Sequence, residues 1–204
     1  MKSAVFASLA TLIVMLLLIF GLYLTAKPPK EQPVVIQYIQ KEDDYEKLCR
    51  ERSEWAHKAL TEVYGIGEPR ASEIAPMIAY ASVIEDVPVE ILVSIIKVES
   101  EFDQKAKSKS GAIGYAQVKP SSWKNQIPYN INNPQGNILA GAYVLKRYYL
   151  ETGSWDNAIR AYNVGITNFN NGREKSAAER YHKKVYAEVR TVLASIPTLS
   201  GGMP

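Results

Sequence analysis

Glu99 has the sequence context of a general acid. It follows the run Ile91–Val98, which is apolar nearly all round and therefore indicates a buried helix. Leu92, Ile95 and Ile96 precede it by seven, four and three positions, the spacing that places side chains on one helix face. Apolar burial and the negative end of a helix dipole both favour a protonated carboxyl group. A carboxylic acid that holds its proton near neutral pH can donate it to a substrate. The alternative is that Glu99 only caps the helix or faces solvent.

Metal and nucleic-acid chemistry have no comparable basis in the sequence. The two histidines, His57 and His182, lie far apart, and no group of Cys, His and Asp has the spacing of metal ligands. We therefore expect no metal and no cofactor. The net charge of +3 is mild, and no dense block of Lys and Arg indicates binding to nucleic acid. The single cysteine, Cys49, cannot form an internal disulfide. We expect it to pack within a helix, with an intermolecular bridge as the alternative.

Amphipathic segments on either side of Glu99 predict a mainly α-helical domain. Asp86 is a suitable N-cap and Pro88 a suitable first-turn residue for the helix that carries Glu99. Apolar spacing and helix-stopping residues predict further helices over 44–64, 71–84, 133–152, 154–165 and 181–194. Strand patterns are almost absent from the sequence.

The N-terminal segment predicts a membrane anchor. Residues Ala4–Ala26 carry no charge, and an apolar helix of about 20 residues is long enough to cross roughly 30 Å of hydrocarbon. A cleavable signal peptide has an apolar core of about 7–15 residues, and Leu24–Ala26 is a poor cleavage site. We therefore expect an uncleaved anchor, with a cleaved signal segment or a buried core helix as alternatives. Lysines on both sides of the run leave its orientation open.

These features divide the chain into four parts. Residues 1–26 form the anchor, and the prolines that follow predict an extended linker over 27–42. Residues 43–196 form one folded domain, and 197–204 form a flexible tail rich in small residues.

Four segments that begin at Glu99 follow one another in a specific order. They are Glu99–Phe102, Ser108–Gln117, Asn137–Gly141 and Ala161–Gly165. No single segment is specific, but their order and spacing resembles the soluble-lytic-transglycosylase-like (SLT) family of peptidoglycan-cleaving enzymes. The resemblance has its motif core over 71–189. It implies a lysozyme-like catalytic domain, α+β with minimal β, which here follows one transmembrane helix.

The resemblance also implies roles for five residues. Glu99 matches the catalytic glutamate of the family. Ser108 and Gln117 match positions that line the sugar-binding groove. Tyr162 and Asn163 match an Ala-Tyr-Asn segment whose tyrosine hydroxyl lies close to the glutamate.

Each groove residue also has a purely structural interpretation. Gln117 could make a structural hydrogen bond, Tyr162 could pack in the core, Ser108 could shape a turn, and Asn163 could close its helix. We expect Gly111 and Gly114 to lie in turns and Asn137 to have a structural role. Trp123 could stack on a sugar, but packing is the expected role.

The sequence departs from the family pattern beside Gln117. Tyr115-Ala116 stands where the family often has Leu-Met, and Val164 replaces a small residue. We expect Ala116 to leave more room on one wall of the groove. This departure concerns the shape of one sugar subsite and not the chemistry.

The resemblance implies a lytic reaction at the β-1,4 bond between N-acetylmuramic acid and N-acetylglucosamine, ending in a 1,6-anhydro sugar. One alternative is a hydrolase of the same fold, a lysozyme or muramidase, which needs a second carboxylate to hold a water molecule. Asp103 follows Glu99 by four residues, but the resemblance places it in a turn with a local hydrogen bond. Another alternative is a non-catalytic module for wall binding or assembly.

The expected partners follow from the anchor and the substrate. They are peptidoglycan glycan strands and the membrane that holds the N-terminal helix. This arrangement predicts a single-pass protein of the cytoplasmic membrane with its domain on the periplasmic or wall side. Assembly partners in an envelope, secretion or phage system stay open, as does a phage-encoded origin.

Overall fold

The computed structural model describes Met15, residues 34–123 and residues 125–196, with the side chains of 34–40 left aside. The chain divides into two compact units, residues 1–41 and residues 42–204. The second unit contains the helices that carry the site. The anchor expected at Ala4–Ala26 lies outside the described residues except for Met15. Within the described part of the chain, no helix combines the length and apolar character needed to cross a bilayer.

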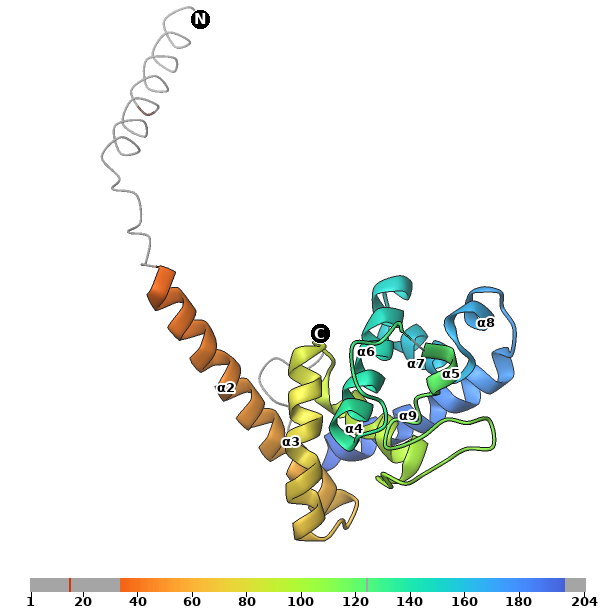
Figure 1. Ribbon diagram of the computed structural model, residues 1–204, viewed down its shortest axis with the longest axis horizontal. Coiled ribbons are helices and arrows are strands. Elements are labelled where there is room, and N and C mark those ends of the chain that lie inside the picture. Colours follow the sequence, from red (N-terminus) through yellow and green to blue (C-terminus); the bar gives the residue numbers. More distant parts are fainter. Residues whose placement is uncertain (1–14, 16–33, 124, 197–204) are drawn as a thin grey trace, which may run out of the picture. The chain divides into compact units, whose positions relative to one another are not determined.

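The described residues are mainly helical, as the sequence predicted (Figure 1). The helices are α2 (Val34–Lys58), the π-helical turn η1 (Ala59–Val63), α3 (Glu68–Ile84), α4 (Val89–Ser100), α5 (Pro120–Trp123), α6 (Pro134–Thr152), α7 (Trp155–Val164), α8 (Ile166–Asn170) and α9 (Lys175–Ser195). Two isolated β-bridges, Lys107–Ile113 and Ile113–Val118, are the β structure of this described part.

Helix α4 is the buried element around which the second unit is built. Its residues from Val89 to Ile96 are all buried, in agreement with the apolar run of the sequence. It packs against α3 and α9, while α6 packs on α3 and α7, and α7 packs on α9. Glu99 is therefore carried on a helix whose position is set by the hydrophobic core.

Helices α6 and α7 begin and end where the sequence predicted. Asn133 caps α6 by accepting a hydrogen bond from the Gly136 amide at 2.6 Å. Gly153, in left-handed backbone conformation, ends the helix, and Gly165 ends α7. Both stop signals are local chain properties, because glycine adopts a positive φ without steric cost.

Other boundaries differ from the sequence predictions. The segment 34–42, expected within an extended linker, lies in α2, so the linker prediction is wrong there. The expected N-cap at Asp86 is also wrong, since α4 begins after Pro88. Asp86 has a φ of 49° in the turn that closes α3, where the Val87 amide donates to the Ser82 carbonyl. The last helix starts at Lys175 rather than near 181. The sequence prediction missed this start because residues 175–180 are polar or small and show no apolar period.

Candidate active site

Glu99 lies in the last turn of α4 and meets α9. The Tyr181 hydroxyl donates a hydrogen bond of 2.6 Å to Glu99 Oε1. Burial raises the pKa of Glu99 to about 7, and the Tyr181 hydrogen bond partly opposes that rise. The physical cause is that the charged carboxylate loses hydration, while a phenol donor stabilises the charge. Glu99 can therefore both hold and release a proton near neutral pH.

Two tyrosines form a stack beside Glu99. The rings of Tyr162 and Tyr181 lie 6.5 Å apart at an interplanar angle of 12°. Burial first, and then the Glu99 charge, raise the pKa of both phenols well above the usual value, so both remain proton donors. The Tyr162 hydroxyl donates to the Ala116 carbonyl at 2.8 Å. The resemblance implied a Tyr162 hydroxyl close to the glutamate, and the Glu99 charge does act on Tyr162. The hydroxyl that donates a hydrogen bond to Glu99 is that of Tyr181, because α9 packs on α4.

A groove of about 650 Å³ runs past Glu99. This volume is in the range of small-molecule sites, which span roughly 300–1,000 Å³. Its lining contains all five residues that the sequence singled out, Glu99, Ser108, Gln117, Tyr162 and Asn163, together with Ser110, Ala112, Val118, Lys119, Ser122, Trp123, Val144, Tyr148, Val164, Gly165, Asn168 and Glu174. Residues from α4, α7 and the loop before α5 thus meet on one surface.

Ser108 shapes a turn at the edge of the groove. Its hydroxyl accepts a hydrogen bond from the Ala112 amide at 2.9 Å and lies 3.0 Å from the Ser110 hydroxyl. Gly111, inside this turn, has a φ of 88°. Ser108 therefore has the structural role considered for it and also lies on the groove surface.

Gln117 likewise combines a structural bond with a place in the groove. Its side-chain amide donates to the Ala106 and Gly114 carbonyls, at 3.1 and 2.9 Å. Its backbone has a φ of 48°, in the left-handed region. Its donors are thus used within the loop, which leaves the amide oxygen as the group available to a ligand.

Asn163 and Trp123 lie on the same groove. Asn163 is exposed next to the end of α7, so its amide is open to solvent and to a ligand. Trp123 packs partly against the core, 6.0 Å from the Tyr148 ring, with the Arg147 guanidinium 5.5 Å from its own ring centroid. Trp123 therefore has the packing role considered for it, with part of its surface in the groove.

The loop that forms one wall of the groove is held by Asn137, in agreement with the structural role expected for that residue. The Asn137 amide accepts from the Ala116 amide and donates to the Ile113 and Ile131 carbonyls, at 2.9, 2.9 and 3.1 Å. Ser100, which the sequence did not single out, donates to the Tyr115 carbonyl at 2.8 Å.

Ala116 does not enlarge the groove as expected. It is fully buried and turned toward α6, and it is absent from the groove lining. A Cβ on Gly141 of α6 would lie 2.4 Å from the Ala116 Cβ. The small residue is explained by this close approach of loop and helix rather than by space for a sugar.

The groove contains one further carboxylate among the described residues, Glu174. It is exposed, has a φ of 54°, and lies 3.4 Å from the Asn168 amide nitrogen. The sequence offered little to identify Glu174 as a groove residue, since it lies in a polar turn with no apolar period. Asp103 is exposed and accepts a hydrogen bond from the Lys105 amide, as expected for a turn residue. Glu101 is exposed at the end of α4.

Comparison with known families adds one finding. The transglycosylase SLT domain model matches residues 76–185, more than half of the chain. The chain belongs to the SLT transglycosylase family. The range matched by the SLT domain runs from α3 into α9 and includes Glu99, the groove loop and Tyr181. Membership in the SLT family implies transglycosylase-type activity on peptidoglycan.

Proposed function

We propose that this protein is a peptidoglycan lytic transglycosylase with a lysozyme-like catalytic domain. It cleaves the β-1,4 bond between N-acetylmuramic acid and N-acetylglucosamine and leaves a 1,6-anhydromuramic acid end. The observation that carries the proposal is Glu99, a carboxyl group with a pKa of about 7 on the wall of a groove in an SLT domain.

The proposed reaction uses Glu99 twice. The protonated carboxyl donates its proton to the glycosidic oxygen, and the C1–O bond breaks with the N-acetylglucosamine side leaving as an alcohol. The N-acetyl group of the muramic sugar stabilises the positive charge that develops at C1. The Glu99 carboxylate then takes the proton of the C6 hydroxyl of the same sugar, whose oxygen bonds to C1. Glu99 gives up one proton and regains one, so it ends in its starting form, and no water or cofactor is consumed.

The other predicted site residues would bind the glycan. Ser108, Gln117 and Asn163 place polar groups along the groove that contains Glu99. Tyr162 contributes a ring whose hydroxyl is already bound to the loop. Tyr181 would stabilise the Glu99 carboxylate after it has given up its proton.

Hydrolysis is the second candidate, and one observation gives it a specific form. Glu174 lies on the same groove as Glu99. Glycosidases that invert at C1 use a second carboxylate to activate a water molecule. In a hydrolase Glu174 would therefore be the residue that activates water, whereas in the lytic reaction it has no chemical step.

Digestion of purified sacculi in oxygen-18 water distinguishes the two reactions. The lytic reaction gives anhydro ends that carry no label, while hydrolysis gives reducing ends that carry one oxygen-18. We expect unlabelled anhydro ends from the wild type. We expect Glu99→Gln to lose at least about 100-fold in rate, the scale of general acid catalysis. Glu101→Gln is the matched control and should retain activity. Labelled ends, with activity lost in Glu174→Gln, would establish the hydrolase instead.

We further propose that the N-terminal segment anchors the domain in the cytoplasmic membrane, with the domain on the periplasmic or wall side. The charge-free run Ala4–Ala26 supports this proposal. N-terminal sequencing of the mature protein and membrane fractionation test it. A new N-terminus near Lys27, or release of the protein without detergent, would replace the anchor with a cleaved signal segment.

A further inference from the structure

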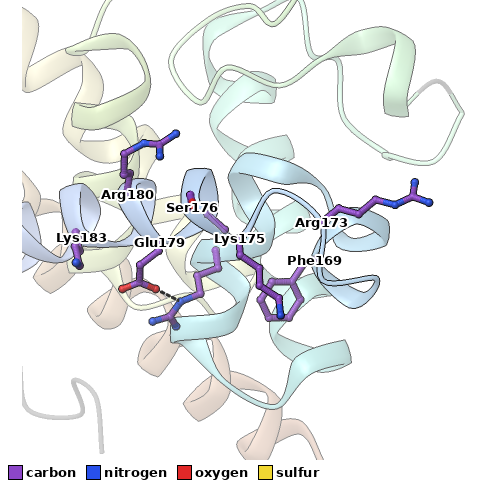
Figure 2. Close-up of a pocket in the computed structure, with 9 residues that line it drawn as sticks. Phe169, Arg173, Lys175, Ser176, Glu179, Arg180 and Lys183 are labelled. Atoms are coloured by element: carbon purple, nitrogen blue, oxygen red, sulfur yellow. Dashed lines mark hydrogen bonds and ion pairs between the residues drawn. The ribbon is translucent and has the colours of Figure 1, made fainter.

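A second pocket of about 710 Å³, here called the basic pocket, lies at the start of α9 (Figure 2). It is lined by Arg160, Phe169, Arg173, Lys175, Ser176, Ala178, Glu179, Arg180 and Lys183. Five of these nine residues are basic and one is acidic, so the lining has a strong positive charge.

The one acidic residue is already neutralised. Arg160 Nε donates to Glu179 Oε2 at 3.0 Å, the contact drawn as a dashed line in Figure 2, and this bond lowers the pKa of Glu179. The other four basic residues, Arg173, Lys175, Arg180 and Lys183, make no ion pair within 4.0 Å in the described part of the chain. Four unpaired cations around one pocket repel one another and attract an anion.

The pocket also contains apolar surface. Phe169 is half-buried against the core, and Ala178 is buried in α9. The pocket therefore suits a ligand that joins anionic groups to aliphatic segments, rather than a compact inorganic anion.

The basic pocket adjoins the catalytic groove. Asn168 and Glu174 line the groove, whereas their chain neighbours Phe169, Arg173 and Lys175 line the basic pocket. Consecutive Cα atoms lie about 3.8 Å apart, so the two linings meet along the segment 168–175. A polymer that passes the Asn168 and Glu174 end of the groove would have side branches near the basic pocket.

We propose that the basic pocket binds the free carboxylates of the peptide stem on the strand held in the groove. This inference rests on the proposed function, which makes peptidoglycan the occupant of the groove. The stem is a short branch of amino acids with free carboxylates and aliphatic side chains, which matches both the charge and the apolar surface of the pocket. The covalent link to the glycan raises the effective concentration of the stem at the pocket, so weak ion pairs are sufficient.

The test compares three forms of one glycan strand. The first carries intact stems, the second has lost its stems to an amidase, and the third keeps stems whose carboxylates are converted to amides. The pocket variant is Arg180→Glu/Lys183→Glu, and Lys184→Glu/Arg190→Glu is the control with the same change of charge on exposed positions of α9. Arg180→Gln/Lys183→Gln repeats the test with a smaller perturbation, and circular dichroism checks that each variant is folded.

We expect the wild type to cleave the intact strand with a kcat/KM about 5- to 20-fold above the other two forms, the scale of two or three surface ion pairs. The pocket variant should lose this preference and match the wild type on stem-free and amidated strands. The control variant should keep the preference. High salt should remove the preference in the wild type, because it screens exposed charges.

Three results would overturn the proposal. One is an unchanged preference in both pocket variants. Another is an equal loss on all three strands, which would assign the cations to the glycan or to folding. The third is equal cleavage of amidated and intact strands by the wild type, which would leave the pocket to some other anion. A wild type that cleaves none of the strands would instead contradict the proposed function, and the stem site would fall with it.

Discussion

At the scale of single residues, the pKa of Glu99 is set by two opposing effects, burial and a hydrogen bond. Its surroundings remove water and favour the neutral acid, while the Tyr181 hydroxyl favours the carboxylate. The balance places the pKa at about 7. A general acid works best when its pKa lies near the working pH, because both the protonated form and its release are then accessible. Tyr181 therefore tunes the pKa of the proposed acid, Glu99.

Tyr181→Phe should raise the pKa of Glu99 further, since it removes the donor that stabilises the charge. A hydrogen bond to a charged group contributes about 1.5 kcal/mol or more, which corresponds to about one pH unit. We expect the descending limb of the kcat/KM profile to move to higher pH by about one unit. We also expect about tenfold lower activity at pH 6, because the carboxylate that forms on proton transfer loses the stabilisation by Tyr181. A pH profile on soluble glycan strands measures both effects.

Tyr162→Phe is the matched control for Tyr181→Phe. It removes a hydroxyl from the other ring of the stack, and that hydroxyl donates to the Ala116 carbonyl instead of Glu99. Its pH profile should keep the wild-type limb. A limb that moves equally in both variants would mean that the stack, and not the Tyr181 hydrogen bond, sets the pKa.

At the scale of elements, the groove depends on one loop held by three helices. Ser100 of α4, Asn137 of α6 and Tyr162 of α7 all bond to the backbone between Ile113 and Ala116. Buried backbone groups need such partners, because an unsatisfied one costs about 1–3 kcal/mol. The loop therefore has its place fixed from three sides, although it contains almost no regular structure.

Gly141→Ala should disturb this arrangement. An added Cβ would lie 2.4 Å from the Ala116 Cβ and 2.9 Å from the Tyr162 hydroxyl, so the loop must move away from α6. We expect a loss of about 1–3 kcal/mol in the free energy of unfolding, typical of overpacking, and a lower kcat. Urea denaturation and turnover of sacculi measure the two quantities.

Gly67→Ala serves as the control for Gly141→Ala. Its backbone φ of −59° suits alanine, and no atom lies within 4 Å of the added Cβ. The change should stay within about 0.5 kcal/mol, as for most surface substitutions. Equal stability of the two variants would show that the loop can move away from α6 without a loss of stability.

At the scale of the whole molecule, the raised pKa of Glu99 lowers the stability of the fold near neutral pH. The ordinary pKa of a glutamate, 4.5, applies to the unfolded chain, and the folded value is about 7. Between these values the unfolded chain releases its proton while the folded protein keeps it. Stability is therefore fully present below pH 4.5, falls as the pH rises through 7, and then stays lower by about 3 kcal/mol.

Glu99→Gln should remove this penalty, because the amide carries no charge at any of these pH values. We expect the variant to match the wild type near pH 4.5 and to exceed it at pH 8 by up to about 3 kcal/mol. This corresponds to a Tm higher by about 5–10 °C for a domain of this size. Thermal unfolding at several pH values measures the difference. A difference that is constant between pH 4.5 and pH 8 would contradict the raised pKa.

The sequence alone determined the helical class and the ends of α6 and α7, and it singled out Glu99 as the candidate acid. These are local properties: apolar spacing marks a buried face, glycine stops a helix, and the order of motifs identifies the family. Glu99 stood out because it follows a helix that is apolar nearly all round and because it begins the ordered motifs. The roles expected of Ser108, Gln117, Tyr162 and Asn163 in sugar binding stay predictions.

Only the tertiary structure decided which groups meet Glu99. Tyr181 lies 82 positions away and has no motif of its own, so its bond to Glu99 exists only because α9 packs across the end of α4. Glu174 and the basic pocket share this property, since their polar residues follow no period that a local pattern can detect. Contacts between distant segments depend on how whole helices pack, and the spacing of residues within one helix carries no information about its partner.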